Sequence, residues 1–358
     1  MTRPAIAHIR LDAFRHNYCL AKQMHGGKAL AVVKANAYGH GAVPCAKAIE
    51  TEADGFAVAS LEEALQLRQA GIKNPILLLE GFFEAAELPA IVTYDVWMVI
   101  HAPWQLDILL ATTLNKPAHV WLKMDSGMHR VGFSPQAFRQ AYARLSGHAN
   151  VEKIVLMSHF ANADDVDSTQ TLQQIACFEK TISELDAKSK VDVSLANSAA
   201  ISAWPQSHAN WARPGIMLYG ADPHFNAETN LRAVMQLSAG IIAIREIQAG
   251  ESIGYGSIFT AERAMRVGVV ACGYADGYPR SAVNAPAAVE GVMTRVIGRV
   301  SMDMLFVDLT HIATAKIGSM VELWGDQVPA NTVAKAAGTI AYELFCNVKR
   351  VQLRYTDV

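Results

Sequence analysis

The stretch 30-LAVVKANAYGHG-41 places a charged amine, that of Lys34, inside an apolar run that predicts a buried strand. Lysine is rare in protein interiors unless its charge is paired or its amine is used chemically. An apolar environment lowers the pKa of a lysine, and the neutral amine is a nucleophile that can form an imine. In the structural alternative, the aliphatic stem packs while the ammonium group reaches solvent. This stretch by itself leaves both interpretations open.

Other chemically active side chains stand at the ends of later apolar runs. The runs 119-HVWLKMD, 154-IVLMSHF and 193-VSLANS contribute Lys123, Asp125, His159, Asn197 and Ser198. Further on, 213-RPGI combines Arg213 with the backbone amides of Gly215 and Ile216. Such amides, together with a serine hydroxyl, could bind a phosphate group. An imine-forming lysine and a phosphate site are the minimal requirements for binding pyridoxal phosphate (PLP).

The elements that must position these residues alternate between short apolar runs and amphipathic segments. The segment 60-SLEEALQLRQAG has a serine to begin a helix and a glycine to end it, and 134-SPQAFRQAYARLSG has the same signals. Apolar runs begin at residues 29, 55, 76, 97, 119, 154 and 193, and either 209-ANWAR or 216-IMLYG supplies an eighth strand. Repeated strand–helix units that close at about eight predict a (β/α)8 barrel.

A barrel would bring the polar residues together, because active sites of this fold lie at the carboxyl ends of the strands. A phosphate site after strands seven and eight is common in such barrels, and this favours 209-ANWAR as the last strand, with Arg213 at its end. A doubly wound open sheet is the competing fold. However, no G-x-G-x-x-G turn follows the first strand, which weakens a dinucleotide-binding interpretation.

After about residue 229 the sequence changes to alternating patterns rich in Val, Ile and Thr, with glycine at short intervals. This texture predicts an antiparallel β domain. A helix-like segment, 332-TVAKAAGTIAYELFCN, follows it. We therefore expect a barrel over residues 1–229 and a β domain over residues 230–358.

Composition excludes several classes of protein. The 358 residues are 51% hydrophobic and 18% charged, which is typical of a globular protein with a large core. No apolar run reaches the ~20 residues of a membrane span, and the N-terminus turns polar too early for a signal peptide. A net charge of −2 gives no indication of nucleic-acid or anionic-membrane binding. Five scattered cysteines without a C-x-x-C pair argue against a disulfide framework or a zinc site, so we expect a reduced, cytoplasmic, soluble protein.

Motifs along nearly the whole chain resemble those of the alanine racemases, which are PLP enzymes with a barrel and a C-terminal β domain. Each motif is weak alone, but their number and order make the resemblance specific. They are 33-VKANAYGHG, 123-KMDSGMHRVG, 157-MSHFA, 196-ANSAA, 213-RPGIMLYG, 254-GYG, 273-GYADGYPR and 301-SMDM.

The resemblance implies that Lys34 holds PLP as a Schiff base, and this favours the chemical interpretation of that lysine. The implied phosphate ligands are Tyr38, Ser198 and the amides of Gly215 and Ile216, with Asn197 beside them. Arg213 is expected to face the pyridine nitrogen. A guanidinium group keeps its proton up to a pKa above ~12, so it cannot protonate that nitrogen. The ring is then a weaker electron sink, which suppresses transamination and favours rapid return of a proton to Cα.

Racemisation needs an acid–base group on each face of Cα. The resemblance assigns one face to Lys34 and the other to Tyr255, contributed by the partner subunit of a homodimer. A free tyrosine has a pKa near ~10, so its surroundings must stabilise the phenolate. His159 and Arg213 are the implied relay. Without the family, Tyr255 would be interpreted as a turn residue between glycines and His159 as a satisfied residue of the barrel rim.

Further residues are assigned to the substrate by the same resemblance. Arg130 is expected to contact the phenolic oxygen of PLP and the substrate carboxylate, for which a planar fork of donors is suited. Met302 is expected to give a backbone amide to that carboxylate, and Asp303 to support the Met302 loop. Tyr274 and Arg280 belong to the implied substrate entry corridor.

Lys123 has two interpretations. In several relatives this lysine is carbamylated, which turns it into an anion that orients the arginine. The alternative is an ordinary ion pair between Lys123 and Asp125.

The chain departs from the family near its C-terminus. Members commonly carry R-V-P there, preceded in some by a tyrosine that touches the phosphate and narrows the entrance. Here 346-CNVKRVQLRY lacks the proline, and Arg350 is expected in the place of the tyrosine. We therefore assign no phosphate role to Tyr342 or Tyr355, and rejection of larger amino acids is not predicted.

The leading hypothesis is an alanine racemase that supplies D-alanine for peptidoglycan or serves alanine catabolism. The alternative is a broader racemase acting on serine or larger amino acids. A PLP-dependent decarboxylase would carry a glycine-rich phosphate loop and an acidic group at the pyridine nitrogen. A PLP carrier would resemble the barrel alone.

Overall fold

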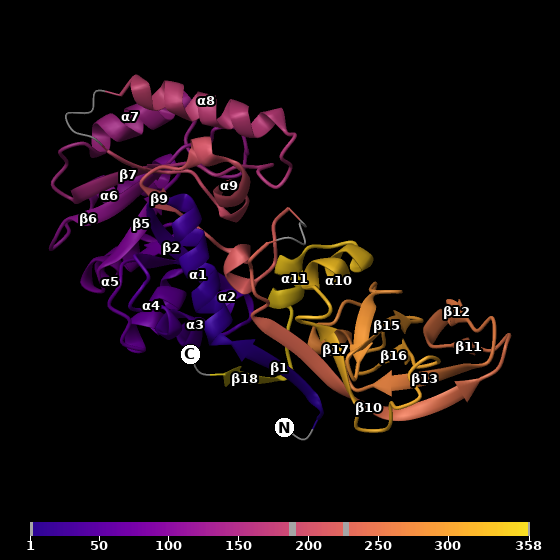
Figure 1. The fold of residues 1–358 in the computed structure, drawn as a ribbon. Coiled ribbons are helices and arrows are strands. Elements are labelled where there is room, and N and C mark those ends of the chain that lie inside the picture. Colours follow the sequence, from indigo (N-terminus) through magenta and orange to yellow (C-terminus); the bar gives the residue numbers. More distant parts are fainter. Residues whose placement is uncertain (1–2, 186–190, 225–228, 357–358) are drawn as a thin grey trace. The chain divides into compact units, whose positions relative to one another are not determined.

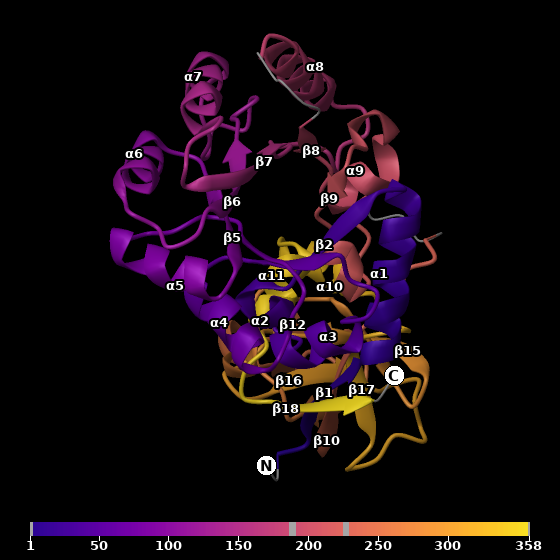
Figure 2. The same cartoon turned by 90° about the vertical axis from the view of Figure 1, so that its left-hand side faces the viewer.

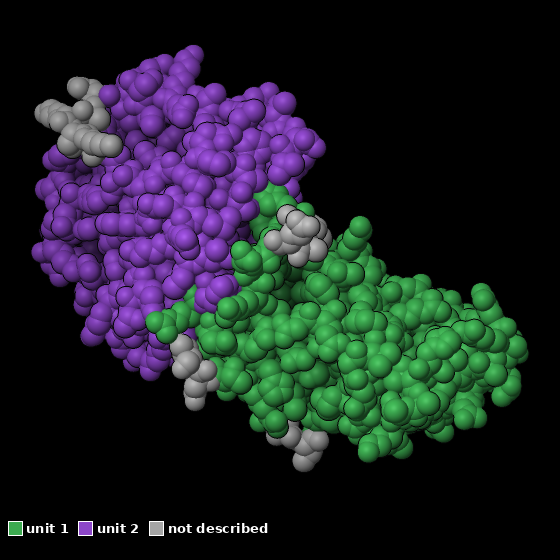
Figure 3. Space-filling model, in the orientation of Figure 1, with its two compact units in different colours: residues 1–15, 38–40, 219–358 green, residues 16–37, 41–218 purple. Residues whose placement is uncertain are grey.

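The computed structural model describes residues 3–185, 191–224 and 229–356. The chain forms two compact units, coloured separately in Figure 3. Residues 16–37 and 41–218 make up the first, which we call the barrel unit. Residues 1–15, 38–40 and 219–358 make up the second, which we call the sheet unit.

The barrel unit contains an eight-stranded parallel sheet in the order β8-β7-β6-β5-β4-β3-β2-β9. A parallel bridge between Asn197 and Arg213 joins the segments that follow β8 and β9, and so closes the ring seen in Figure 2. The predicted (β/α)8 barrel is confirmed, with its last strand inside 209-ANWAR, whereas Ile216–Tyr219 forms a 3-10 helix. The strands are β2 (Lys28–Val32), β3 (Gly55–Val58), β4 (Ile76–Leu78), β5 (Val96–Ile100), β6 (Ala118–Lys123), β7 (Val151–Met157), β8 (Asp192–Ser194) and β9 (Trp211–Ala212).

Helices cover the outside of the ring (Figure 2). Strands β3 and β4 are buried along their whole length, because side chains fill the barrel on one face and helices cover the other. The helices between Leu11 and Ala203 are α1 (Leu11–His25), α2 (Lys34–Tyr38), α3 (Ala42–Ala48), α4 (Leu61–Gln69), α5 (Leu88–Thr93), α6 (Pro103–Ala111), α7 (Pro135–Leu145), α8 (Thr169–Ser183) and α9 (Ser198–Ala203), with 3-10 turns at Ala85–Glu87 and Pro205–Ser207.

The serine predicted to cap α7 does so, whereas the serine predicted to cap α4 does not. The Ser134 hydroxyl accepts a backbone N–H of the first turn of α7 at 3.4 Å, as its position predicts. Ser60 stands at the N-cap of α4, but its side chain makes no capping hydrogen bond. The Glu63 carboxylate instead accepts the N–H groups of Ala59 at 2.8 Å and Ala35 at 2.7 Å. Glu63 therefore ties the start of α4 to the segment that follows β2.

The sheet unit is built mainly from antiparallel strands, as predicted. The long strand β10 pairs with β1 and β17 through its first half and with β13 through its second half. Strands β10, β13, β16, β15, β14 and β17 thereby form a small closed barrel. The strands are β1 (Ala5–Arg10), β10 (Met235–Ile247), β11 (Ser252–Ile253), β12 (Phe259–Thr260), β13 (Met265–Val270), β14 (Pro286–Val289), β15 (Val292–Ile297), β16 (Leu305–Asp308), β17 (Met320–Trp324) and β18 (Gln352–Thr356), shown in Figure 1.

Two features of the sheet unit differ from the sequence analysis. Strand β1, which the predicted barrel range 1–229 includes, lies antiparallel to β10 and parallel to β18. The predicted C-terminal helix is divided into α10 (Ala330–Ala337) and α11 (Ala341–Cys346). Gly338 ends α10 in the left-handed region at φ 71°, where glycine is favoured. No helix of the described residues is long and apolar enough to cross a membrane.

Candidate active site

Lys34 lies just beyond β2, in a single turn of left-handed helix, rather than at the centre of the strand. The φ angles of Ala35, Asn36, Ala37 and Tyr38 are 51°, 55°, 52° and 49°. Left-handed conformation costs roughly 1–2 kcal/mol for each residue with a Cβ, so the surroundings must hold this turn. The sequence does not predict this turn, because none of the four residues is glycine.

Hydrogen bonds at both ends fix the left-handed turn. The Glu63 carboxylate accepts the Ala35 N–H, and the Asn36 side chain accepts the N–H of Ala42 at 2.9 Å. The Asn36 carbonyl accepts the N–H of Gly41 at 2.9 Å. Among the described residues, the half-buried Lys34 amine has no hydrogen-bond or ion-pair partner. The turn therefore presents an amine that is free to react.

Lys123, the last residue of β6, is buried, with 7% of its surface exposed. Burial first, and then the positive charges of Arg213, Arg130 and Lys34, lower the pKa of the Lys123 amine to about 7. Its amine has no partner in the part of the chain that the structure describes. Lys123 is therefore a lysine that is largely neutral just above neutral pH.

The ion pair between Lys123 and Asp125, the alternative interpretation of this lysine, is not formed. The Asp125 carboxylate accepts the N–H groups of Gly127, Met128 and His129, each at 3.0 Å, and pairs with the His129 ring at 3.3 Å. Asp125 therefore organises the loop after β6. The exposed Arg130 follows this loop, and its charge acts on both Lys123 and His159.

Arg213 follows β9 and is buried. One of its terminal nitrogens donates to the carbonyls of Ser158 at 2.7 Å and Leu195 at 3.2 Å, and the other donates to the Ser194 hydroxyl. Burial lowers the pKa of Arg213 to about 10, which leaves it protonated at neutral pH. Its Nε has no acceptor among the described residues. This donor is available to a ligand acceptor such as a pyridine nitrogen.

His159 lies 3.4 Å from Arg213, measured from the His159 Nδ1 to the Arg213 Nη2. Burial, and after it the Arg213 charge, lower the pKa of His159 well below its usual range, so the ring is neutral. Because a guanidinium nitrogen has no acceptor, Nδ1 faces Arg213 without a proton, and the proton of the neutral ring is on Nε2. His159 can therefore donate a hydrogen bond from Nε2.

Gln174, on α8, supports His159 and was missed by the sequence analysis. Its amide nitrogen donates to the His159 carbonyl at 3.0 Å and to the Ser126 hydroxyl at 3.2 Å. Ser126 in turn contacts the Ser158 hydroxyl at 2.7 Å. Ser126, Ser158 and His159 lie in two of the motifs quoted above, whereas Gln174 lies in none of them. Only their burial side by side makes them a network.

Ser198, Gly215 and Ile216 form a cradle suited to an anion. Ser198 is the first residue of α9, and Asn197 caps this helix by accepting a backbone N–H at 3.0 Å. The Ser198 hydroxyl accepts the N–H of Gly215 at 2.8 Å. Both backbone amides are free in the sequence-based prediction, whereas in the structure only the amide of Ile216 has no acceptor among the described residues. The cradle therefore has one free amide, that of Ile216. The amide of Gly215 already donates to the Ser198 hydroxyl, so a phosphate would share it with Ser198.

Tyr38 lies in the sheet unit, where it is buried. Its ring stacks on Tyr219, with centroids 4.7 Å apart, and lies 5.6 Å from Tyr342. Burial raises the pKa of Tyr38 well above its usual range, so its hydroxyl remains a donor. The aromatic neighbour contributed by the C-terminal segment is thus Tyr342. The expectation that Arg350 fills such a place is wrong, because Arg350 lies with Asp276 and Asp303.

The remaining predicted residues are exposed loop residues of the sheet unit. Tyr255 follows Gly254 in a 3-10 turn and has 69% of its surface exposed. Met302 is 53% exposed, and its backbone N–H has no acceptor among the described residues. Tyr274 and Arg280 line one cavity of about 890 Å³, together with Arg299 and Lys349.

The chain is similar to known proteins over nearly its whole length. The family model described as alanine racemase, N-terminal domain, matches residues 9–223, and that described as alanine racemase, C-terminal domain, matches residues 234–355. The alanine racemase of Pseudomonas entomophila is 57% identical over 98% of both chains, and the catabolic alanine racemase of Pseudomonas putida is 56% identical over 99% of both.

The solved structures that resemble this chain are also alanine racemases. The biosynthetic alanine racemase of Pseudomonas aeruginosa superposes with a TM-score of 0.95 at 48% identity, covering 99% of this chain and 100% of that one. The alanine racemase of Bartonella henselae, whose structure has covalently bound pyridoxal phosphate, superposes with a TM-score of 0.86 at 30% identity, over 99% of both chains.

Proposed function

Since this chain belongs to the alanine racemase family, an enzyme family of isomerases, we propose that it interconverts L- and D-alanine with pyridoxal phosphate as cofactor. The proposed enzyme is a homodimer in which each active site takes Tyr255 and Met302 from the partner subunit. Such an arrangement fits the 69% exposure of the Tyr255 ring in the isolated chain.

The observation that carries the proposal is the surroundings of Arg213. This buried arginine has a free Nε donor, it contacts His159, and no carboxylate contacts it among the described residues. An arginine at the pyridine nitrogen favours proton exchange at Cα over reactions that need a carbanion of long lifetime. A transaminase or decarboxylase would require an acid at this place.

The residues of the barrel rim fit PLP. Lys34 would hold the cofactor through its free amine, and the Ser198 cradle would bind the phosphate, for which the resemblance also implies the hydroxyl of Tyr38. When bound, the cofactor supplies the electron withdrawal that makes the Cα proton of an amino acid acidic. The remaining chemistry belongs to side chains of the protein.

Two bases complete the proposed mechanism. Lys34 removes or returns the Cα proton on one face, and Tyr255 of the partner subunit does so on the other. The N–H on Nε2 of His159 can donate to a phenolate oxygen, and Arg213 keeps His159 in that tautomer. The substrate carboxylate is bound by the Arg130 guanidinium and by the free Met302 amide.

The test is chiral chromatography of L-alanine after incubation with the purified protein loaded with PLP. We expect an approach to equal amounts of the two enantiomers without pyruvate. Absence of D-alanine from protein that holds PLP would contradict the proposal. Turnover of serine or lysine at a rate similar to that of alanine would replace it by the broader racemase.

A second experiment tests the place of the cofactor. Borohydride reduction should fix PLP covalently to the wild-type protein and not to Lys34→Ala, because the free Lys34 amine lies at the end of the rim strand β2. Peptide mass spectrometry locates the adduct. Trapping that persisted in Lys34→Ala would show that another lysine holds the cofactor.

The physiological role is proposed as either D-alanine supply for peptidoglycan or alanine catabolism, in the cytoplasm. Relatives carry both descriptions: one at 56% identity is catabolic, and one at 48% is biosynthetic. A deletion strain separates the roles: a need for added D-alanine indicates supply, and loss of growth on alanine as carbon source indicates catabolism.

A further inference from the structure

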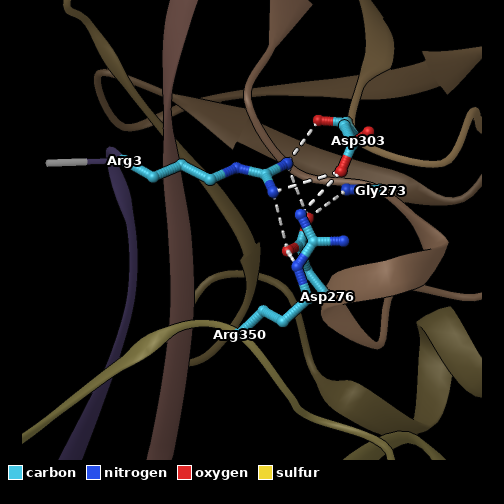
Figure 4. A network of polar contacts seen from close by, with 5 residues as sticks. All are labelled: Arg3, Gly273, Asp276, Asp303 and Arg350. Atoms are coloured by element: carbon cyan, nitrogen blue, oxygen red, sulfur yellow. Dashed lines mark hydrogen bonds and ion pairs between the residues drawn. The ribbon is translucent and has the colours of Figure 1, made fainter. Parts of the chain in front are cut away.

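We propose that Arg3 and Arg350 are positioning residues for the loop that carries Met302, and that they set the affinity for the substrate carboxylate through it. This inference rests on the proposed function, in which the Met302 amide binds that carboxylate. The group formed by Arg3, Asp276, Asp303 and Arg350 is called the Asp276 clamp below and is shown in Figure 4.

Asp276 is the centre of the clamp. Its carboxylate is fully buried and receives Arg3 at 2.8 Å and the N–H of Gly273 at 2.9 Å. A buried carboxylate is costly unless it is paired and hydrogen-bonded, so these contacts are required for the fold of this corner. The Arg350 Nε lies 3.8 Å from the same carboxylate.

Asp303 is held by both arginines. The Arg350 guanidinium donates to the Asp303 carboxylate at 2.8 Å, and Arg3 donates to the Asp303 backbone carbonyl at 2.6 Å. Arg3 comes from the N-terminal segment and Arg350 from the C-terminal one. Two distant parts of the chain therefore fix one loop of the sheet unit.

The clamp acts on two loops that bond directly to each other. The N–H of Tyr274 donates to the Ser301 carbonyl at 3.1 Å, and the N–H of Ala275 donates to the Met302 carbonyl at 3.0 Å. A Cβ on Gly273 would lie 2.4 Å from both of these carbonyl oxygens, so only glycine permits this approach. Asp276 belongs to one loop and Asp303 to the other.

The consequence is that Met302 has a fixed backbone with one free donor. The carbonyls of Ser301, Met302 and Asp303 are all used, by Tyr274, Ala275 and Arg3 respectively. The N–H of Met302 is left without an acceptor among the described residues. The clamp thereby holds a backbone donor in place before the substrate arrives, and such preorganisation reduces the cost of binding.

Loss of the clamp should raise KM more than it lowers kcat. The substrate carboxylate keeps its charge throughout racemisation, so a contact to it stabilises ground state and transition state alike. For Arg350→Ala we expect a KM for L-alanine raised about threefold to tenfold, with kcat within about twofold of wild type. Arg350→Lys, which keeps a donor to Asp303, should recover part of the affinity. Arg354→Ala is the matched control and should leave KM unchanged: Arg354 lies in β18, shortly after Arg350, and its guanidinium bonds only to Gln352 among the described residues.

Amide hydrogen exchange tests the clamp without reference to activity. In Arg350→Ala the amides of Tyr274 and Ala275 should exchange faster, whereas in Arg354→Ala they should exchange as in wild type. If Arg350→Ala does not fold, KM and amide hydrogen exchange are measured on Asp303→Asn instead. Unchanged exchange together with unchanged KM would overturn the inference. A wild-type protein without alanine racemisation would overturn the proposed function instead, and the exchange data would still decide whether the clamp holds these loops.

Discussion

At the scale of single residues, burial gives Lys123 a chemistry that lysine does not have in water. The pKa of its amine is lowered to about 7 by burial and by neighbouring positive charges, and no described residue pairs with it. A carbamate forms only from a neutral amine and CO2. It would also give this site a negative charge beside Arg130, the role that the resemblance implies. Lys123 therefore has the properties that carbamylation needs.

We predict that Lys123 binds CO2 with a dependence on pH that centres near 7. The neutral fraction of the amine rises as the pH increases through its pKa, so the carbamate should be present at pH 8 and largely lost at pH 6. Carbon-13 NMR with labelled bicarbonate measures it. Lys123→Arg, which keeps the charge but forms no carbamate, is the control, and a signal that survives in this variant would contradict the prediction.

We predict that Tyr255→Phe retains bound PLP and loses racemisation by roughly a factor of 100 or more, as expected for removal of an acid–base group. With Lys34 intact, exchange of the Cα proton in D2O should continue for one enantiomer only. Proton NMR of L- and D-alanine measures this. Tyr94→Phe, an exposed tyrosine of the barrel unit, is the control. Undiminished racemisation in Tyr255→Phe would exclude the two-base assignment.

At the scale of elements, the left-handed turn at Ala35–Tyr38 shows how a functional segment departs from local preference. Four successive residues with a Cβ adopt positive φ angles, although none of them is glycine. Backbone N–H groups that donate to the side chains of Glu63 and Asn36 hold the turn. Strain of this kind is typical of segments that place a reactive group.

We predict that Ala35→Gly raises the free energy of unfolding by up to about 1 kcal/mol, since relief of the left-handed strain exceeds the entropic cost of glycine. The exposed Ala143, in the right-handed helix α7, is the matched control, and Ala143→Gly should lower stability by about the same amount. Urea unfolding at fixed protein concentration compares the two. A loss of stability in both variants would show that the turn is not strained.

At the scale of the whole molecule, the candidate catalytic residues lie in different compact units. Lys34, His159 and Arg213 belong to the barrel unit, whereas Tyr255 and Met302 belong to the sheet unit. In the proposed dimer, each active site combines the barrel unit of one subunit with the sheet unit of the other. Inactive variants of the two sets should therefore complement each other.

We predict that mixing Lys34→Ala with Tyr255→Phe, under conditions that exchange subunits, restores racemisation to about a quarter of wild type. Random mixing makes half of the dimers hybrid, and each hybrid has one intact site of two. The mixture is assayed against each variant alone. If a single subunit supplied both bases, no pairing would contain an intact site, and activity would not return.

The sequence by itself predicted the barrel, which the structure confirms, and a set of candidate site residues. Barrel strands are covered on both faces, so they appear as continuous apolar runs, and polar residues such as Lys123 and His159 are visible at their ends. Motif order then identified the family, which the matching domain models confirm. The roles of individual residues remain predictions.

Only the tertiary structure decided which distant groups meet. Strand β1 joins the C-terminal sheet by pairing with β10 and β18. The sequence could not predict this, because these partners are more than 200 residues away and pairing over such distances leaves no local pattern. No local pattern predicts the hydrogen bond of Gln174 to His159 or the contact of Tyr342 with Tyr38 either. Arg350 was expected in an aromatic position and instead pairs with Asp303, because the folded chain brings a carboxylate to it. Residue type and spacing predict what a side chain can do, whereas burial and neighbours, which depend on the whole fold, decide what it does.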